Sequence, residues 1–337
     1  MLCPALYSCG EKKEKFTAYS LDYFDTATTI VGYEENKEDF DRVSSEILSQ
    51  LSEYHRLYTI YHRFDGMENL CTVNELTDGV HREVTVDKRI IDMLLFAKEM
   101  YRRTDGKVNI ALGSVLSIWH DYRTAGLDQP KDASLPTLEE LLDASEHTDI
   151  DCVIIDEQAS TVYISDPRVT LDVGAVAKGY AVEMVARSLE EKGISGYVIN
   201  VGGNVRTVGA KSNGEKWIAG IENPDTDSDE PYRKYLALAG ESVVTSGSYQ
   251  RYYTVDGKNY HHIINPDTLF PAEGYLSVSV VGKSSAMGDA LSTALFCMPF
   301  EEGLALVESL SETEAMWIMS DGTEKTSSGF SRFVDGN

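Results

Sequence analysis

Apolar residues recur at helical spacing in two long stretches of the N-terminal half of the chain. Over residues 37–61, and again over residues 86–100, apolar side chains return every three or four positions, which predicts two helices that each bury one face. Asp87 can cap the start of the second helix with its carboxylate. A short helix is predicted to open at residues 134–137, and another helix is predicted over residues 299–310.

Shorter apolar runs predict strands. Residues 21–31 are expected to form one strand with an Asp-Thr pair in its middle, and residues 153–155 and 162–164 are expected to form a hairpin across a polar turn. Further strands are predicted at residues 197–201, 276–281 and 315–319. Because hairpins and helices are mixed along the chain, the pattern favours an α+β fold over a doubly wound parallel sheet.

The balance of charges restricts the partners of the protein. The 337 residues include 30 Lys and Arg against 55 Asp and Glu, which gives a formal net charge of −25. Nucleic acids are bound by clustered lysines and arginines, so this balance argues against a nucleic-acid partner. A site for an anionic ligand in such a chain needs a cation or helix-end dipoles to offset the repulsion.

The five cysteines show no spacing typical of a zinc site, and scattered free thiols are their simplest interpretation. Cys9 differs, because residues 6–10 (Leu-Tyr-Ser-Cys-Gly) look like a bacterial lipobox. The preceding residues are few and lack the basic segment of a full signal peptide, so a chance match is the alternative. We expect residues 1–19 to be a tether that is lipid-anchored at Cys9, outside the cytoplasm, which would be the protein's contact with a membrane.

A lysine is predicted at the start of a helix near residues 175–176. The segment 171–180 reads Leu-Asp-Val-Gly-Ala-Val-Ala-Lys-Gly-Tyr, which places Lys178 in the first turn. A helix N-terminus attracts anions, and a lysine there is unfavourable for the helix itself. The conflict suggests that Lys178 serves an anionic ligand, with a solvated surface lysine as the alternative. The order of residues does not match a Walker loop.

Two glycines follow the strand predicted at residues 197–201. Gly202 and Gly203 allow a close approach of backbone to a ligand or to another chain segment, and a tight turn between strands explains them equally well. The Gly-x-Gly-x-x-Gly pattern of a Rossmann site is absent from this segment.

Two adjacent histidines follow a predicted turn at residues 256–257 (Asp-Gly). Neighbouring side chains on a strand point to opposite faces, so His261 and His262 are not expected to line one pocket together. One of them is therefore expected to be structural, and the pair is a weak signal for a metal site.

Asp289 and Thr293 are spaced to share one face of a helix over residues 288–295. A carboxylate and a hydroxyl are hard oxygen ligands, which suit a Mg²⁺ ion that keeps waters and bridges to phosphates. An N-capping aspartate with a core-facing threonine is the alternative.

Five motifs, taken in order, resemble the FAD:protein FMN transferase family, also called the ApbE family. They are the Asp-x-Gly-x-x-Ala-Lys-Gly pattern at 172–179, Gly-Gly at 202–203, Thr-Ser-Gly-x-Tyr at 245–249, His-Ile-Ile-x-Pro-x-Thr at 262–268 and Asp-Ala-x-x-Thr at 289–293. The resemblance covers roughly residues 20–320. It implies an ApbE-like α+β domain over residues 20–330, with mixed or antiparallel sheets, packed helices and an FAD cleft.

The resemblance also implies site residues. Mg²⁺ would be held by the carbonyl of Ala175 with Asp289 and Thr293. His262 would lie beside the reacting diphosphate as the general base, and Lys178 would neutralise a diphosphate oxygen. FAD would be contacted by Phe24, Tyr61, Lys107, Val108, Asn109, Asp172, Lys178 and Ile263.

The chain departs from the family pattern at three positions. Asn265 stands where the family usually has Asp, Leu269 stands where it usually has Gly, and Asn109 is often Asp in relatives. The two asparagines argue against a carboxylate base at either position, and they leave Lys178 and the metal ligands unchanged.

The activity implied is a Mg²⁺-dependent flavin transfer. A Thr or Ser hydroxyl of an acceptor protein would attack the FMN phosphorus of FAD, and AMP would leave. Relatives flavinylate extracytoplasmic redox-pump subunits, so an acceptor of that kind is expected. Two alternatives remain open at this point: an FAD diphosphatase that releases FMN and AMP, and a flavin-binding lipoprotein without turnover.

Overall fold

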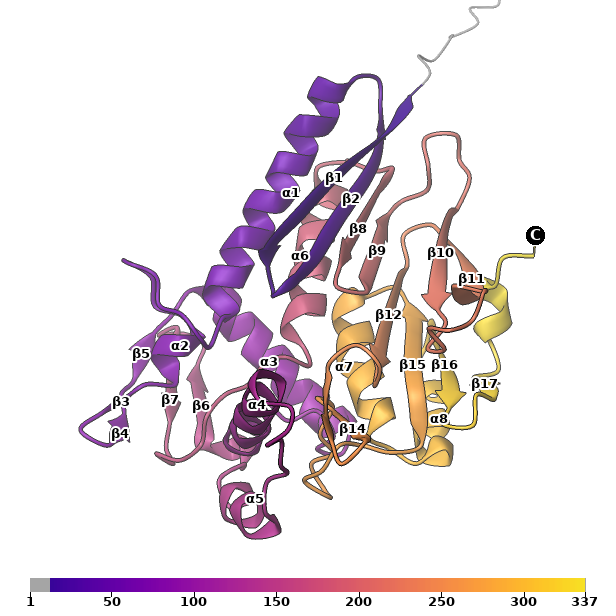
Figure 1. The fold of residues 1–337 in the computed structure, drawn as a ribbon. Helices are drawn as coiled ribbons and strands as arrows, with labels where there is room; N and C mark the ends of the chain where they lie inside the picture. Colours follow the sequence, from indigo (N-terminus) through magenta and orange to yellow (C-terminus); the bar gives the residue numbers. More distant parts are fainter. Residues whose placement is uncertain (1–12, 337) are drawn as a thin grey trace, which may run out of the picture.

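The computed structural model describes residues 13–336. Its centre is an eight-stranded sheet in which every neighbouring pair is antiparallel (Figure 1). In spatial order the strands are β1 (Glu14–Tyr23), β2 (Thr26–Glu34), β8 (Tyr197–Val201), β9 (Asn204–Val208), β12 (Ser242–Gly247), β15 (Tyr275–Gly282), β16 (Thr313–Met319) and β17 (Glu324–Thr326).

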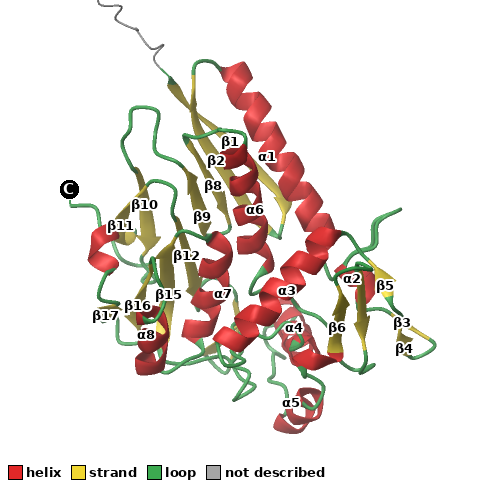
Figure 2. Cartoon of the chain, turned by 180° about the vertical axis from the view of Figure 1, so that it is seen from behind, coloured by secondary structure: helices red, strands yellow, loops and turns green. Residues whose placement is uncertain are grey.

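Helices cover one face of this sheet, as Figure 2 shows from behind. Fully buried Ile47 and Leu51 of one helix pack in the same core cluster as Ile30 and Ile199 of the sheet, so apolar burial joins the two layers. The covering helices are α1 (Lys37–Tyr58), α6 (Ala177–Glu191), α7 (Ser285–Phe296) and α8 (Phe300–Glu308).

A second group of elements lies beyond the lower end of α1 in Figure 1. It includes the helices α2 (Leu70–Val73), α3 (Lys88–Arg103), α4 (Gly113–Asp128) and α5 (Leu138–Ser145), and the short strands β3 (Leu76–Thr77), β4 (Val80–His81), β5 (Val84–Thr85), β6 (Val153–Asp156) and β7 (Thr161–Ile164). Two hairpins complete the sheets, β10 (Trp217–Glu222) with β11 (Tyr232–Leu238) and β13 (Tyr252–Val255) with β14 (Lys258–His261), and two short 3-10 helices span Ile150–Cys152 and Phe330–Phe333.

The hairpin β13–β14 packs against α4, and this contact brings distant parts of the sequence together. Trp119 of α4 shares a core cluster with Tyr253 and Ile264, and its indole Nε1 donates a hydrogen bond of 2.9 Å to the carbonyl of Leu269. A buried indole N–H needs such an acceptor, so the bond fixes the position of α4 beside the segment that carries the two histidines.

The prediction of an α+β fold with antiparallel sheets is confirmed, and several elements lie where their patterns placed them. Asp87 caps α3 by accepting from the backbone N–H of Arg89, and Asp105 and Gly106 form a turn after this helix with φ of 48° and 78°. β6 and β7 pair as a hairpin.

The single strand predicted at residues 21–31 is wrong. The chain turns at Phe24 and Asp25, whose φ values are 55° and 50°, and β1 and β2 pair on either side. Two left-handed residues are what a tight hairpin turn requires, and the sequence lacks the Asn-Gly or Asp-Gly pair that usually signals it. β1 also begins at Glu14, so residues 14–19, assigned above to a tether, belong to the sheet edge.

Helix α4 was missed in the sequence, and its first residue shows why. Leu112 stands at the N-cap without a side-chain hydrogen bond, and only four residues of the helix are buried, namely Gly113, Val115, Trp119 and Gly126. Neither a capping signal nor a regular apolar stripe marks this segment.

The predicted lipid anchor Cys9 lies outside the described residues. Within residues 13–336, no helix has both the length and the apolar character that crossing a membrane requires.

Candidate functional site

Helices α6 and α7 touch at Gly179, and this contact fixes Asp289. The backbone N–H of Gly179 donates to Oδ2 of Asp289 at 2.7 Å, and Asp289 is only 4% exposed. A Cβ on residue 179 would lie 2.3 Å from the Cβ of Asp289, so only glycine permits the approach. Lys178 lies in the first turn of α6, as the sequence predicted.

The other oxygen of Asp289 has only long contacts. Its Oδ1 lies 3.4 Å from Nζ of Lys178 and 3.4 Å from Nδ2 of Asn204. Asn204 is 1% exposed, and because its amide nitrogen faces the carboxylate, its buried Oδ1 has no partner among the described residues. Buried polar groups are normally hydrogen-bonded, so Oδ1 of Asp289 and Oδ1 of Asn204 can each still bind a ligand.

Hydroxyl groups collect beside Asp289 on the same helix. Oγ1 of Thr293 lies 3.5 Å from Oγ of Ser246 on β12, which in turn lies 2.8 Å from Oγ of Ser292. Ala175 lies in the turn that leads into α6. One carboxylate with neutral oxygens fits Mg²⁺, which keeps waters and substrate oxygens as further ligands. The described residues contain no cluster of three or more His, Cys, Asp or Glu around a metal-sized space.

A second group of predicted residues gathers at the tip of the β1–β2 hairpin. The N–H of Phe24 donates to Nδ1 of His55 at 3.2 Å. Tyr61 lies just past α1 with 58% of its surface exposed, and its hydroxyl is 3.4 Å from Nδ1 of His120. Partial burial of the hydroxyl and the charge of Asp172 raise the pKa of Tyr61 to about 12. The ring of Tyr61 is therefore exposed and neutral, as a stacking surface for a flavin requires.

The segment with Lys107, Val108 and Asn109 runs beside Asp172. The N–H of Asp172 donates to the carbonyl of Ile110 at 2.9 Å. The three side chains of this segment are already paired or buried. Lys107 pairs with Asp267, Val108 is buried, and Asn109 donates to the carbonyl of Thr148 and accepts from the N–H of Ala111. A ligand here would therefore meet mainly the main chain.

The two histidines have different environments. Nε2 of His261 lies 2.8 Å from the carbonyl of Ala272, and its Nδ1 accepts from the N–H of Ile263 at 3.2 Å. Both ring nitrogens are thus occupied by main-chain groups, which is the arrangement of a structural histidine. Ile263 itself is 6% exposed, so it offers a ligand little of its side chain.

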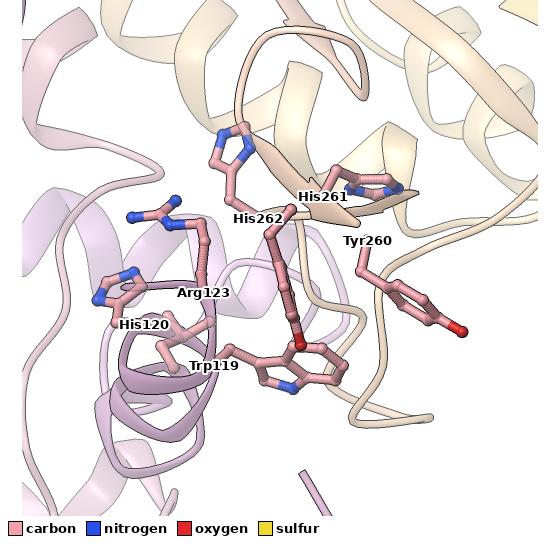
Figure 3. A pocket seen from close by; sticks show the side chains of 8 residues that line it. Trp119, His120, Arg123, Tyr260, His261 and His262 are labelled. Carbon is pink, nitrogen blue, oxygen red and sulfur yellow. The ribbon is translucent and has the colours of Figure 1, made fainter. Parts of the chain in front are cut away.

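His262 keeps one ring nitrogen without a hydrogen-bond partner among the described residues. Its Nδ1 lies 3.2 Å from the carbonyl of Arg251, and a carbonyl only accepts, so Nδ1 carries the proton and Nε2 is the basic nitrogen. Desolvation, and next the charge of Arg251, lower the pKa of His262 to about 3. Figure 3 shows His262 on the side of Arg123 and His120, while His261 and Tyr260 point away.

Three residues of this group were not predicted from the sequence: His120, Arg123 and Arg251. His120 and Arg123 lie on α4, the helix that the sequence did not reveal, and line a crevice with His261 and His262. The prediction that the two histidines do not line one pocket together is therefore wrong: β14 ends at His261, so the alternation of strand side chains does not extend to His262. Arg251 follows β12, and its Nη2 donates to the carbonyl of Asp25 at 3.1 Å. The crevice holds about 10 Å³, which is room for one water, so it is too small for a flavin.

These features together define a class of protein. A carboxylate oxygen without a close partner beside a lysine, and a histidine near two arginines, are features typical of an enzyme that acts on a phosphate-bearing ligand. The chain belongs to the ApbE family, whose model matches residues 21–317.

Relatives with a known name extend over most of the chain. An FAD:protein FMN transferase from Klebsiella pneumoniae (strain 342) is 31% identical over 272 residues, which cover 78% of this chain and 81% of the relative. A protein of the same name from Haemophilus influenzae is 25% identical over 325 residues, which cover 95% and 89%.

Solved structures show the same fold. An ApbE protein from Thermotoga maritima matches with a TM-score of 0.81 at 25% identity, over 96% of this chain and 100% of the other. The flavin transferase ApbE from Vibrio cholerae matches with a TM-score of 0.78 at 25% identity, over 95% and 99%.

Proposed function

We propose that this protein is an FAD:protein FMN transferase, an enzyme that cleaves FAD and attaches FMN through a phosphoester to a Thr or Ser of an acceptor protein. The proposal rests mainly on the environment of Asp289. The N–H of Gly179 binds one of its carboxylate oxygens, and the other oxygen faces Nζ of Lys178 at 3.4 Å without a closer partner. The names of the relatives agree with it over three quarters of the chain or more.

We propose the following roles for the residues of this chain. The acceptor hydroxyl attacks the FMN phosphorus, the bond from phosphorus to the AMP oxygen breaks, and Nε2 of His262 takes the hydroxyl proton. Lys178 neutralises charge on the diphosphate, which matters because charge spreads over the phosphoryl oxygens in the transition state. His262 is neutral before the ligand binds, and an adjacent diphosphate raises its pKa, which makes it a stronger base.

The proposed metal is Mg²⁺, held by Asp289, Thr293 and the carbonyl of Ala175. When bound, it supplies Lewis-acid stabilisation to the diphosphate. The unpartnered Oδ1 of Asn204 and the hydroxyls near Thr293 support this assignment, because they add neutral oxygens that can bind metal-held waters.

The proposed flavin contacts are Phe24 and Tyr61, with Asp172, Ile263 and the segment from Lys107 to Asn109 along the rest of FAD. The exposed ring of Tyr61 and its position beside Phe24's hairpin, His120 and Asp172 support stacking on the isoalloxazine.

We also propose that the protein works outside the cytoplasm, lipid-anchored to the membrane at Cys9, on an acceptor such as a redox-pump subunit. The lipobox-like residues 6–10 support this proposal. Cell fractionation tests it, because Cys9→Ser should move the protein from the membrane fraction to the soluble fraction. An unlipidated cytosolic wild-type protein would contradict it.

Asp289 provides the test of the proposed function. Wild-type enzyme, FAD, Mg²⁺ and an acceptor protein should yield an acceptor that fluoresces in a denaturing gel, and Asp289→Ala should abolish the signal at every Mg²⁺ concentration. Asp151→Ala is the matched control, since it removes a carboxylate that is 87% exposed at its side chain and that lies outside the proposed site. Transfer that persists in Asp289→Ala would remove the metal assignment, and FMN released to solvent without labelling would indicate an FAD diphosphatase.

A further inference from the structure

Two arginines in the site have no carboxylate partner. Among the described residues, every arginine pairs with an Asp or Glu within 4.0 Å except Arg56, Arg123 and Arg251. Arg56 lies over the ring of Phe64 instead. Unpaired arginines are unexpected in a chain with 55 acidic residues, so their position calls for a physical reason.

Arg123 and Arg251 lie close enough to repel each other. Arg251 is the largest cause, after burial, of the lowered pKa of the Arg123 guanidinium. Arg123 is partly buried on α4, and Arg251 is tied to the tip of the β1–β2 hairpin through the carbonyl of Asp25. Two cations held together without a counter-charge are unfavourable, and an anion between them would turn the repulsion into attraction.

Both arginines also lie near His262. Arg123 lines the same crevice as His262 (Figure 3), and the main chain of Arg251 orients the imidazole. We propose that Arg123 and Arg251 are phosphate-binding residues that hold the FMN-side phosphate of FAD next to His262. The proposal rests on the proposed transferase function and names the residues that bring the reacting phosphorus to the base.

Guanidinium groups suit this task. Arginine donates to phosphate in a fork of two N–H groups, and such charge-assisted hydrogen bonds are about twice as strong as neutral ones.

Burial, and after it the charges of Arg251, His261 and Arg123, lower the pKa of His262 before FAD binds. The charged and titratable groups that face His262 are Arg251, Arg123 and His261, and the same crevice is lined by His120, Tyr253 and Tyr260. No carboxylate is among them. A bound phosphate supplies the missing negative charge, so the pKa of His262 rises on binding and the base becomes competent when its substrate arrives.

The test compares FAD with riboflavin, which has the same ring system and no phosphate. Arg123→Gln and Arg251→Gln should each weaken FAD binding by about tenfold or more, measured by flavin fluorescence with Mg²⁺ present, because each removes a charge-assisted hydrogen bond. Riboflavin binding should stay within about twofold. Arg102→Gln, which removes an exposed surface arginine of the same charge, should change neither.

A pH profile provides a second readout that a structural role would not change. Removing either positive charge should raise the pKa of His262, so the acid limb of kcat/KM for transfer should move to higher pH in both variants. The melting temperature of each variant shows whether it is folded.

Three results would overturn the proposal. Equal losses for FAD and riboflavin would indicate a general loss of structure. Normal FAD binding with a raised KM for the acceptor would mean that the arginines meet the acceptor protein, and an unchanged pH profile would separate them from His262. If wild-type enzyme binds FAD but labels no acceptor, the transferase function fails, and the ratio of FAD to riboflavin affinity still decides the role of the arginines.

Discussion

At the scale of single residues, we expect replacement of the two adjacent histidines to have opposite effects on transfer and on stability. His262→Ala should reduce FMN transfer by about 10²–10⁴-fold, the usual contribution of a general base, while FAD affinity stays within a few-fold. His261→Ala should leave turnover nearly unchanged, because both of its ring nitrogens bind main-chain groups. It should lower stability instead, since the carbonyl of Ala272 and the N–H of Ile263 lose their partner. Transfer rates and urea unfolding measure both effects.

The reverse result would show that the roles of the two histidines have been exchanged. If His261→Ala is inactive and His262→Ala retains activity, the base is His261. If both variants keep full activity, the proton acceptor lies elsewhere.

The sequence revealed those site residues that belong to local motifs. Lys178 and Asp289 were predicted because helix spacing and ligand chemistry mark them within a few positions. Arg123 and Arg251 were not, because they are 128 positions apart in the chain and meet only through the packing of α4 against β13–β14. A pattern within one segment of the sequence cannot predict that two residues so far apart in the chain come together.

At the scale of elements, the contact between α6 and α7 is the feature that the site depends on. Gly179→Ala would place a methyl group 2.3 Å from the Cβ of Asp289 and 2.4 Å from the carbonyl of Ser285. The helices must separate, at a cost of about 1–3 kcal/mol of stability. We expect loss of transfer as well, since Asp289 moves with α7.

Gly303→Ala on α8 is the matched control. Its nearest atom beyond the helix backbone would be Cδ2 of Leu295 at 3.1 Å, the end of a flexible side chain. Alanine also improves helix propensity by about 1 kcal/mol, so this variant should be as stable as wild type or slightly more stable. Full transfer activity in Gly179→Ala, measured beside Gly303→Ala, would show that the helix contact does not position Asp289.

The elements also show where local patterns fail. Helices α1 and α3 have regular apolar stripes and were predicted, although α1 ends at Tyr58 and leaves Tyr61 outside the helix. The turn at Phe24 and Asp25 was missed because Phe is not typical of a left-handed conformation and the pair lacks the glycine that usually signals such a turn. That turn brings the main chain of Phe24 to His55, which the sequence pattern does not indicate.

At the scale of the whole molecule, the histidines predict how stability depends on pH. Five of the seven have a pKa lowered chiefly by burial: His55, His81, His120, His261 and His262. The unfolded chain takes up these protons near pH 6.5 while the folded protein resists them, so stability is complete above that pH and falls below it. The free energy of unfolding in urea should therefore be lower at about pH 5 than at about pH 7.5.

His81 tests the cause, because it is 4% exposed and its Nε2 contacts the carbonyl of Val169. His81→Gln keeps a donor and removes the titration, so its stability should depend less on pH than that of the wild-type protein. Stability that rises as the pH falls to about 5 would mean that relief of repulsion in a chain of net charge −25 outweighs the histidines.

The central claim is that FMN moves from FAD to a protein hydroxyl. The most direct measurement is the intact mass of the acceptor after incubation with enzyme, FAD and Mg²⁺, together with the amount of AMP formed. The account predicts that the acceptor gains the mass of one FMN less one water, with one AMP for each FMN attached, and that an acceptor without its Thr or Ser hydroxyl gains nothing. AMP and free FMN with no change in the acceptor's mass would contradict it.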